Sequence, residues 1–309
     1  MAGRIFVTGA SGRLGREVME LIPDAIPLVR KPSGFKNEVV TDFSPDSLHY
    51  ALSGASAIIH LAGSRDFLDM KKAREGNVNL TWMVVDAAPK SARIILSSSI
   101  SVYGKKLARI PADEGTETQP DTPYARTKLE AERIVEGRPD HVILRIGPIY
   151  GPGFGEYPKV LRMLKEGKMR IVGDGSNRIP FVHVADVASA IRNALTQGRG
   201  IYVLTGECLT QKEIFNIAAA ELGVEPPKKS VHPLLAMAYA RFGLLRSQVL
   251  GGKPEFIPED IAVLSSDRAF DCTKAEKDLG FRPRPLREGI KEMVRLLSEP
   301  SSVEKPESS

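Results

Sequence analysis

Tyr124 and Lys128 are the residues of this 309-residue chain whose types and spacing most directly suggest chemistry. They lie four apart in a stretch typical of a helix, with Pro123 just before it. Residues four apart share one face of a helix, so the phenol and the ammonium group can meet at one point. A phenol titrates near ~10, but a neighbouring cation lowers its pKa and makes it a usable proton carrier. Tyr and Lys are also common on helix surfaces, so the pair gains meaning only from further residues.

A glycine-rich turn from Gly9 to Gly15 follows an apolar stretch, Arg4 to Thr8, and precedes a helical run that begins at Arg16. A strand, a turn and a helix in this order form the setting that a dinucleotide-binding fingerprint requires. Glycine lets the backbone turn tightly and approach a pyrophosphate, whose charge then meets the helix N-terminus. The alternative is a plain glycine turn. We favour a cofactor-binding loop made of Gly9, Ser11, Gly12, Arg13, Leu14 and Gly15.

The residue after the second expected strand indicates which dinucleotide is bound. This strand, from Ala25 to Val29, ends at Arg30, where an acidic residue would otherwise hold the adenosine ribose hydroxyls. The planar guanidinium group of arginine suits a 2′-phosphate instead, and Arg13 on the glycine loop could assist. A solvated basic turn is the alternative. The sequence therefore favours NADP over NAD as the cofactor.

Strands and helices alternate along the first half of the chain. Buried-strand patterns occupy residues 4–8, 25–29, 39–42, 57–63, 93–96 and 141–145. This alternation predicts an α/β fold, a doubly wound parallel sheet of the Rossmann type. Ser99 follows the fifth strand, and ligands bind beyond the carboxyl ends of parallel strands. We therefore expect Ser99, the glycine loop and the Tyr124 helix to meet, with the serine hydroxyl bonded to a substrate oxygen.

The composition changes after residue 147, where glycines and prolines interrupt the regular alternation. We assign residues 1–147 and roughly 178–200 to the dinucleotide-binding Rossmann domain. A smaller, interleaved C-terminal part, which comprises 148–177 and 201–298, is expected to bind the substrate. The last segment, 299–309, is rich in Ser, Pro and Glu and is expected to be a disordered tail.

The overall composition is that of an ordinary globular protein, with 42% hydrophobic and 26% charged residues and a net charge of +5. No basic run is interleaved with aromatic residues, which argues against nucleic-acid binding. The two cysteines, Cys208 and Cys272, form no disulfide framework and no metal-spaced cluster, so we expect no metal site and a cytoplasmic location. No apolar run approaches the ~18–20 residues that span a bilayer. The uncharged run 234–240 is expected in the core or in an apolar pocket wall.

Short motifs follow one another in order along nearly the whole chain. They are Thr8-Gly-Ala-Ser-Gly-Arg-Leu-Gly15, Thr41-Asp42, His60-Leu-Ala-Gly63, Ser97-Ser-Ser-Ile-Ser-Val-Tyr-Gly104, Tyr124-x-x-x-Lys128, Tyr150-Gly-Pro152, Gly173-Asp-Gly175 and Arg178-x-x-Phe-Val-His-Val-Ala-Asp186. Together they resemble the extended short-chain dehydrogenase/reductase family, the NAD-dependent epimerase/dehydratase group.

The resemblance implies a catalytic set of Ser99, Tyr124 and Lys128. Tyr124 would exchange a proton with the substrate hydroxyl while hydride passes to or from the nicotinamide. Lys128 would keep the phenol acidic and hold the nicotinamide ribose. Relatives are typically homodimers through the Tyr124 helix and the helix before the serine strand, so a homodimer is expected. Besides the glycine loop and Arg30, the implied cofactor-binding residues are Asp42 at the adenine amino group, Phe43, Leu61, Ala62, Gly63, Ser97, Tyr124 and Lys128.

The residues expected to bind the small-molecule substrate suggest two different substrate classes. In many nucleotide-sugar relatives the arginine equivalent to Arg178 binds a diphosphate, although a surface ion pair explains Arg178 equally well. Their substrate-contacting asparagine is replaced by Pro148, and Arg145-x-Gly-Pro-x-Tyr-Gly151 is similar to hydroxysteroid dehydrogenases and dihydroflavonol reductases. We therefore expect an NAD(P)-dependent oxidoreductase for an apolar secondary alcohol or ketone, held by Ser99 and Arg178. A nucleotide-sugar 4-epimerase and, more remotely, a non-catalytic dinucleotide sensor are the alternatives.

Overall fold

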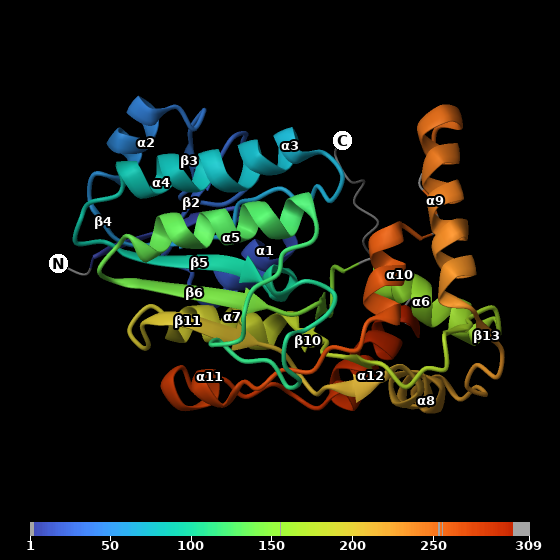
Figure 1. Cartoon of the computed structure of the whole chain (residues 1–309). Coiled ribbons are helices and arrows are strands. Elements are labelled where there is room, and N and C mark those ends of the chain that lie inside the picture. Colours follow the sequence, from blue (N-terminus) through green and yellow to red (C-terminus); the bar gives the residue numbers. More distant parts are fainter. Residues whose placement is uncertain (1–2, 155, 253, 255, 299–309) are drawn as a thin grey trace.

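A seven-stranded parallel sheet forms the centre of the computed structural model, which describes residues 3–154, 156–252, 254 and 256–298 (Figure 1). The tail expected to be disordered, 299–309, lies outside the described residues. In sheet order the strands are β11 (Gly200–Leu204), β6 (His141–Ile146), β5 (Arg93–Ser99), β4 (Ala55–His60), β1 (Arg4–Thr8), β2 (Ile26–Val29) and β3 (Val39–Val40). The order reverses between β1 and β4, as in a doubly wound Rossmann fold.

Helices cover both faces of this sheet (Figure 1). Successive strand residues point to opposite faces, so Ile58 packs with the helices of one face and Ile59 with those of the other. Both faces are buried, which is why these strands are apolar throughout. One face carries α2 (Pro45–Leu52), α4 (Leu80–Ala87) and α5 (Pro123–Glu136), and the other carries α1 (Arg13–Leu21), α7 (Val184–Asn193) and α11 (Thr273–Asp278).

The helix expected between the fourth and fifth strands is divided into three pieces. These are α3 (Met70–Arg74), a one-turn π-helix η1 (Glu75–Asn79) and α4. Gly76 lies in η1, and a Cβ there would collide with the side chain of Ser64. Single π-turns inside helices are frequent at functional sites, and this one places Asn77 beside the loop after β4.

A smaller C-terminal part packs beyond the carboxyl ends of the strands (Figure 1). Its core contains Leu161, Ile214, Phe215 and Ile290. Three two-stranded pairs connect its segments: β7 (Ile149–Tyr150) with β10 (Val182–His183), β9 (Arg178–Ile179) with β12 (Leu209–Thr210), and β8 (Ile171–Val172) with β13 (Ser230–Val231). Its helices are α6 (Glu156–Lys165), α8 (Gln211–Leu222), α9 (Pro233–Leu250), α10 (Pro258–Ser265) and α12 (Leu286–Ser298).

Two features of this part differ from the sequence-based expectations. First, β11 pairs in parallel with β6, so the central sheet reaches residue 204 and extends past the expected boundary at residue 200. Second, α9 stands away from the sheet, and apart from its buried Ala236 and Ala240 it exposes large apolar side chains, with Leu234 74% and Phe242 67% exposed (Figure 1). The expectation of a core helix or pocket wall is wrong for most of α9. None of the described helices is long and apolar enough to cross a bilayer.

Candidate active site

The glycine loop between β1 and α1 has the backbone shape that a pyrophosphate requires. Gly9 has a φ of +71°, and a Cβ there would lie 2.6 Å from the amide nitrogen of Ala62. A Cβ on Gly15 would collide with the carbonyl oxygen of Gly9. Gly12 is the N-cap of α1 and provides no side-chain cap, so the first amides of the helix face the space where an anion would bind. The tight glycine turn and the uncapped helix N-terminus therefore fit the pyrophosphate of a dinucleotide.

Three consecutive serines end β5 at the edge of the same space. The carbonyl oxygen of Ser97 accepts a hydrogen bond from Lys128 Nζ at 2.7 Å. Ser98 Oγ donates to the buried carboxylate of Glu132. Ser99 Oγ accepts from the amide of Ser101 at 3.1 Å, where it caps a short 3₁₀ turn, η2 (Ile100–Tyr103). All three serines line the cavity, and Ser99 is the one of them that is not buried.

Helix α5 begins at Thr122, whose Oγ1 accepts from the amide of Ala125 at 3.1 Å. Pro123 occupies the first helical position, where its missing amide hydrogen costs nothing. This start places Tyr124 in the first turn with its ring against Phe67, at a centroid distance of 5.0 Å. The capped N-terminus of α5 therefore holds the Tyr124 phenol at the cavity.

The pKa of Tyr124 is raised in this structure, because burial disfavours the phenolate. A hydrogen bond with Ser99 and the charge of Arg65 oppose this effect. The sequence predicted that Lys128 would lower the pKa, and that expectation is not met, because the ammonium group is turned toward Ser97. The phenol consequently keeps its proton at neutral pH and can donate it to a substrate oxygen.

Lys128 is buried, with 6% of its surface exposed. Burial lowers its pKa to about 8, and the negative charge of Glu132 acts in the opposite direction. Gly63 leaves room for this side chain, because a Cβ at that position would lie 3.5 Å from Lys128 Nζ and 2.7 Å from Asn77 Oδ1. Asn77 in turn bonds Ser64 and Thr127, so the loop after β4 and helix α5 are tied together.

A buried ion pair lies beneath the catalytic residues. The guanidinium group of Arg145 on β6 donates to both carboxylate oxygens of Glu132 on α5, at 3.2 and 2.8 Å. These side chains are 5% and 1% exposed. Arg145 also donates to the hydroxyl of Tyr103 at 2.8 Å, and Ser98 donates to Glu132. The network joins β5, β6, α5 and η2, and so fixes the positions of Ser99 and Lys128.

A single cavity of about 1300 Å³ connects the glycine loop with the serine strand end, α5 and the C-terminal part. It extends between α6, α8, α10 and α12, where most of its lining is apolar. Among the residues predicted from the sequence, those that line it are Gly9, Gly12, Arg13, Leu14, Gly15, Leu61, Gly63, Ser97, Ser99, Tyr124 and Lys128.

The other predicted site residues lie outside this cavity lining. Arg30 follows β2, and its guanidinium carbon lies 5.5 Å from the ring centroid of Phe43. Asp42 accepts from the amide of Ser44 and from Ser47 Oγ, which lowers its pKa to about 2. Both lie near β3, at the edge of the sheet where the expected adenosine end would reach. Ser11 and Ala62 are likewise adjacent to lining residues without being among them.

Arg178, the predicted substrate residue, is bound to a partner on the protein itself. Its guanidinium group donates to Asp267 at 2.9 and 2.6 Å, and its amide donates to the same carboxylate. It does not line the cavity. This geometry is the surface ion pair of the alternative interpretation rather than a diphosphate-binding arginine.

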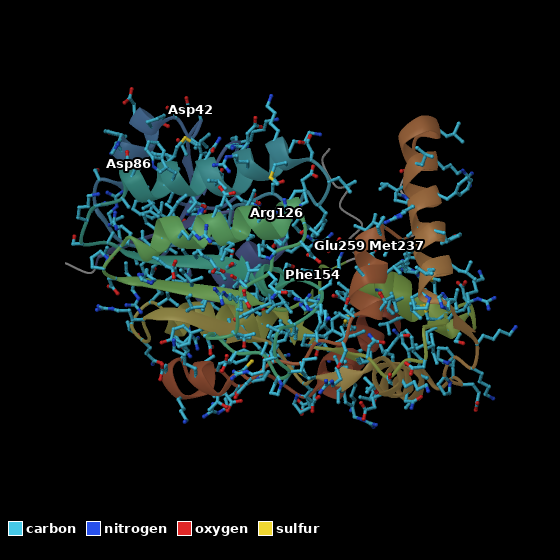
Figure 2. The ribbon with its side chains drawn as sticks, in the orientation of Figure 1. Asp42, Asp86, Arg126, Phe154, Met237 and Glu259 are labelled. Atoms are coloured by element: carbon cyan, nitrogen blue, oxygen red, sulfur yellow. The ribbon has the colours of Figure 1, made fainter. Side chains whose placement is uncertain are left out.

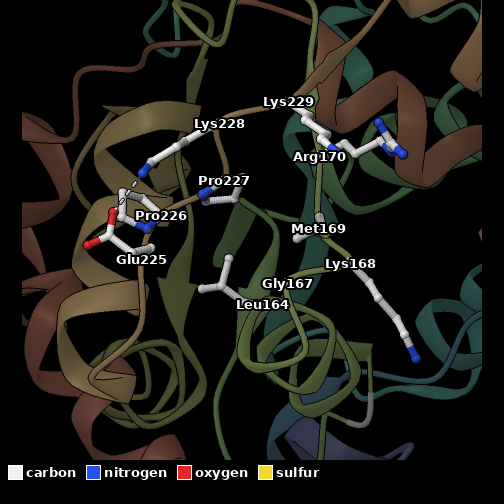
Figure 3. A pocket seen from close by; sticks show the side chains of 10 residues that line it. All are labelled: Leu164, Gly167, Lys168, Met169, Arg170, Glu225, Pro226, Pro227, Lys228 and Lys229. Atoms are coloured by element: carbon white, nitrogen blue, oxygen red, sulfur yellow. Dashed lines mark ion pairs between the residues drawn. The ribbon is translucent and has the colours of Figure 1, made fainter.

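A second, smaller hollow lies between α6 and the segment before β13 (Figure 3). Four of its lining residues are basic, but Lys228 pairs with Glu225 at 3.1 Å and Lys168 with Glu166 at 2.6 Å. None of the predicted catalytic or cofactor residues lines it. Its lysines lie at the surface and do not form a preorganised binding site.

Comparisons with known proteins agree with this geometry. The model of the NAD dependent epimerase/dehydratase family matches residues 5–218. The chain belongs to this family. It is 30% identical over 276 residues to the 3beta-hydroxysteroid-dehydrogenase/decarboxylase isoform 2 of Arabidopsis thaliana, covering 79% of this chain and 49% of the relative, so it spans about half the length of that protein. It is 26% identical over 318 residues to the sterol-4-alpha-carboxylate 3-dehydrogenase, decarboxylating, of Bos taurus, covering 91% and 88% of the two chains.

Among solved structures, MoeE5 in complex with UDP-glucuronic acid and NAD is 25% identical, with a TM-score of 0.71 and coverage of 95% of this chain and 98% of MoeE5. Membership in the epimerase/dehydratase family and this likeness confirm the predicted Rossmann-type fold. The glycine loop, the serine strand end and the Tyr124 helix follow one another in the predicted order.

Several cavity residues of this family member were not predicted from the sequence. Arg65 and Phe67 stand beside Tyr124, and Phe154 meets the guanidinium group of Arg13 at 5.3 Å from its ring centroid. Glu259 and Arg268 line the cavity from the C-terminal part, and Figure 2 shows Phe154 and Glu259 between the sheet and the helices of that part. These residues come from separate segments without a motif, so no local pattern marked them.

Proposed function

We propose that the chain is an NAD(P)-dependent oxidoreductase that transfers hydride between the nicotinamide and a secondary alcohol or ketone on an apolar substrate. The observation that carries this proposal is the single cavity that joins the glycine cradle to Ser99, Tyr124 and Lys128 and continues between apolar side chains. The two sterol dehydrogenases to which the chain is similar support a substrate of this kind.

The chain's own residues would divide the work in a simple way. The glycine loop would hold the pyrophosphate, and the bound dinucleotide would accept or give the hydride. Tyr124 would donate its proton to the ketone oxygen, or take the proton of the alcohol in the reverse direction. Ser99 would hold the same oxygen, and Lys128 would contact the nicotinamide ribose. The apolar walls would exclude water from this step.

Replacing Tyr124 by Phe tests the proposal. With NADP or NAD and a panel of secondary alcohols that includes 3-hydroxysteroids, the unaltered protein should form reduced nicotinamide. Tyr124→Phe should reduce kcat by about 10²–10⁴-fold, because the proton carrier is lost. Thermal stabilisation by the cofactor should stay unchanged. Tyr50→Phe serves as the control, because Tyr50 is 87% exposed and remote from the cavity. Near-normal turnover in Tyr124→Phe would remove Tyr124 from its role.

For the cofactor, we propose that NADP is preferred over NAD. Arg30 supports this preference, because it stands exposed at the end of β2, where it can meet a 2′-phosphate. Arg30→Asp should shift the ratio of the dissociation constants for NADP and NAD toward NAD by tenfold or more, the scale of a lost charge-assisted pair. Calorimetric titration with both dinucleotides measures this ratio, and an unchanged ratio would contradict the assignment of Arg30.

A nucleotide-sugar 4-epimerase is the second candidate, favoured by the likeness to MoeE5 with UDP-glucuronic acid and NAD. An epimerase returns the hydride within one turnover, so it would isomerise a UDP-sugar without net formation of reduced cofactor. The ion pair between Arg178 and Asp267 and the presence of Pro148 in the cavity wall weigh against it. Product analysis after incubation with UDP-sugars separates the two candidates.

For assembly and location, we propose a homodimer that works in the cytoplasm. Trp82 on α4 is 53% exposed, and α4 and α5 lie side by side on one face, which supports an interface there (Figure 1). Both cysteines carry free thiols, in keeping with a reducing compartment. Sedimentation analysis of the unaltered protein and of Trp82→Glu tests the dimer, because a charge at this position should favour the monomer.

A further inference from the structure

Arg268 is a buried cation in the wall of the cavity. The side chain is 8% exposed, and its Nη2 donates to the carbonyl oxygen of Ile100 at 2.6 Å. Its Nε is buried and has no hydrogen-bond partner among the described residues. The nearby carboxylate of Asp267 is bound to Arg178 instead. Within the described part of the chain, Arg268 takes part in none of the ion pairs.

A buried guanidinium group without a counter-ion is costly, because its desolvation is not offset by an opposite charge. Burial accordingly lowers the pKa of Arg268 to about 10. The charges of Asp121 and Glu259 act on it only at longer range, and burial raises the pKa of Glu259 itself, which disfavours its ionised form. Besides the carbonyl oxygen of Ile100, the guanidinium group meets the ring of Phe270, whose centroid lies 5.7 Å from its carbon, and no ion pair among the described residues compensates its charge.

The backbone around Arg268 is held firmly. Its amide donates to the carbonyl oxygen of Arg178 at 3.0 Å, and the carbonyl oxygen of Ala269 accepts from the amide of Ala112 at 2.9 Å. The bond to Ile100 then fixes the end of the side chain. Ligands are recognised best by side chains whose position is fixed in this way before binding.

The position of Arg268 relative to Ser99 indicates where its anion would lie. Arg268 is bonded to Ile100, the residue after Ser99, and consecutive Cα atoms are about 3.8 Å apart. Arg268 and Ser99 also line the same cavity, so an anion on this guanidinium group would lie at the Ser99 end of it. A carboxyl group close to the reacting carbon would be placed there, whereas the diphosphate of a nucleotide sugar is separated from its reacting 4-hydroxyl by the sugar ring.

We propose that Arg268 binds the carboxylate of a 3-hydroxy or 3-oxo acid with an apolar body. The inference rests on the proposed oxidoreductase function, because the same cavity holds both groups. The carboxylate would accept charge-assisted hydrogen bonds from the part of the guanidinium group that lines the cavity. The apolar body would lie against side chains that line the rest of the cavity, such as Phe154, Ile214 and Phe256. Arg268 is in this view the residue that selects acids over neutral alcohols.

Paired substrates test the proposal: 3-hydroxy acids, including a 4-carboxy-3-hydroxysteroid, and their methyl esters. The unaltered protein should show a kcat/KM for the acid about ten- to hundredfold above that for the ester, the scale of hydrogen bonds to a charged group. Arg268→Gln should bring this ratio close to one, mainly by raising KM for the acid. Arg268→Lys should lie between the two, because lysine keeps the charge but not the planar fork. Arg178→Gln is the matched control and should keep the ratio of the unaltered protein.

The outcomes separate this proposal from the proposed function. Turnover of both substrates with an unchanged ratio in Arg268→Gln would overturn the role of Arg268 and leave the oxidoreductase standing. If Arg268→Gln does not fold, an unchanged ratio in Arg268→Lys has the same meaning. If no alcohol is oxidised at all, the proposed function fails, and ligand binding then tests the carboxylate site on its own. In that case thermal stabilisation by the acid that is lost in the Arg268 variants supports the carboxylate site, whereas stabilisation by UDP-sugars alone overturns it.

Discussion

The buried ion pair beneath the active site gives the sharpest test of how the fold supports the site. Glu132→Gln keeps the shape of the side chain but removes its charge, and so leaves the guanidinium group of Arg145 buried without a counter-ion. Its acceptors are then neutral: the glutamine oxygen, the Tyr103 hydroxyl and a more distant carbonyl. Removing one partner of a buried pair typically costs about 3–5 kcal/mol of the free energy of unfolding. Glu130→Gln on the same helix is the control. Its pair with Arg74 is solvent-exposed, with side chains 34% and 52% exposed, and should cost less than about 1 kcal/mol.

Urea unfolding of the two variants measures this difference. A second reading comes from the pH dependence of kcat/KM, because Glu132 raises the pKa of Lys128 against the effect of burial. Without that negative charge, the pKa of Lys128 should fall below about 8, and the alkaline limb of the kcat/KM profile should move to lower pH. Equal losses of stability in Glu132→Gln and Glu130→Gln, together with an unmoved alkaline limb, would refute the reasoning.

Two further predictions concern the glycine loop and a core histidine. Gly15→Ala should abolish cofactor stabilisation in a thermal-shift assay, because its Cβ would collide with the carbonyl oxygen of Gly9. Gly12→Ala should weaken this stabilisation less, because its Cβ would meet the same oxygen at 3.2 Å. Equal effects of the two variants would contradict the steric account. His60 is fully buried between Thr8 and Thr81, and burial lowers its pKa to about 3 from 6.5. The unfolded chain therefore binds one more proton between these pH values, so stability should fall as pH drops from about 6.5 toward 3, by up to ~1.4 kcal/mol per pH unit, and His60→Asn should flatten this slope in urea unfolding at several pH values.

The parts of the fold that the sequence predicted correctly, and the predicted residues that the structure brings together, are those that a local pattern encodes. Apolar runs ending in small residues marked β1, β4 and β5, and the steric limits on Gly12 and Gly15 arise within the loop itself. The spacing of Tyr124 and Lys128 likewise needs only the helix period. Ser99 could be joined to them because the carboxyl ends of parallel strands meet at one edge.

The features that the sequence did not reveal depend on segments far apart in the chain. Arg268 meets Ile100, 168 positions away, and nothing near Arg268 in the sequence signals that contact. The pKa of Tyr124 depends on burial by neighbouring loops, which the pair with Lys128 could not show. In α9 the apolar composition was plain, but composition does not tell whether a face has a partner, and most of this helix has its large side chains in solvent.

The pairing of β11 with β6 has a consequence for how the chain can be divided or synthesised. The glycine loop and the three proposed catalytic residues lie before residue 147, yet β6 acquires its outer neighbour only from residues 200–204. A piece that stops at residue 147 would present the unpaired edge of an apolar strand, which invites pairing with other chains. On the ribosome, the sheet likewise stays open until the intervening substrate-binding segment has emerged. The first 147 residues and the segment that supplies β11 thus complete one sheet together.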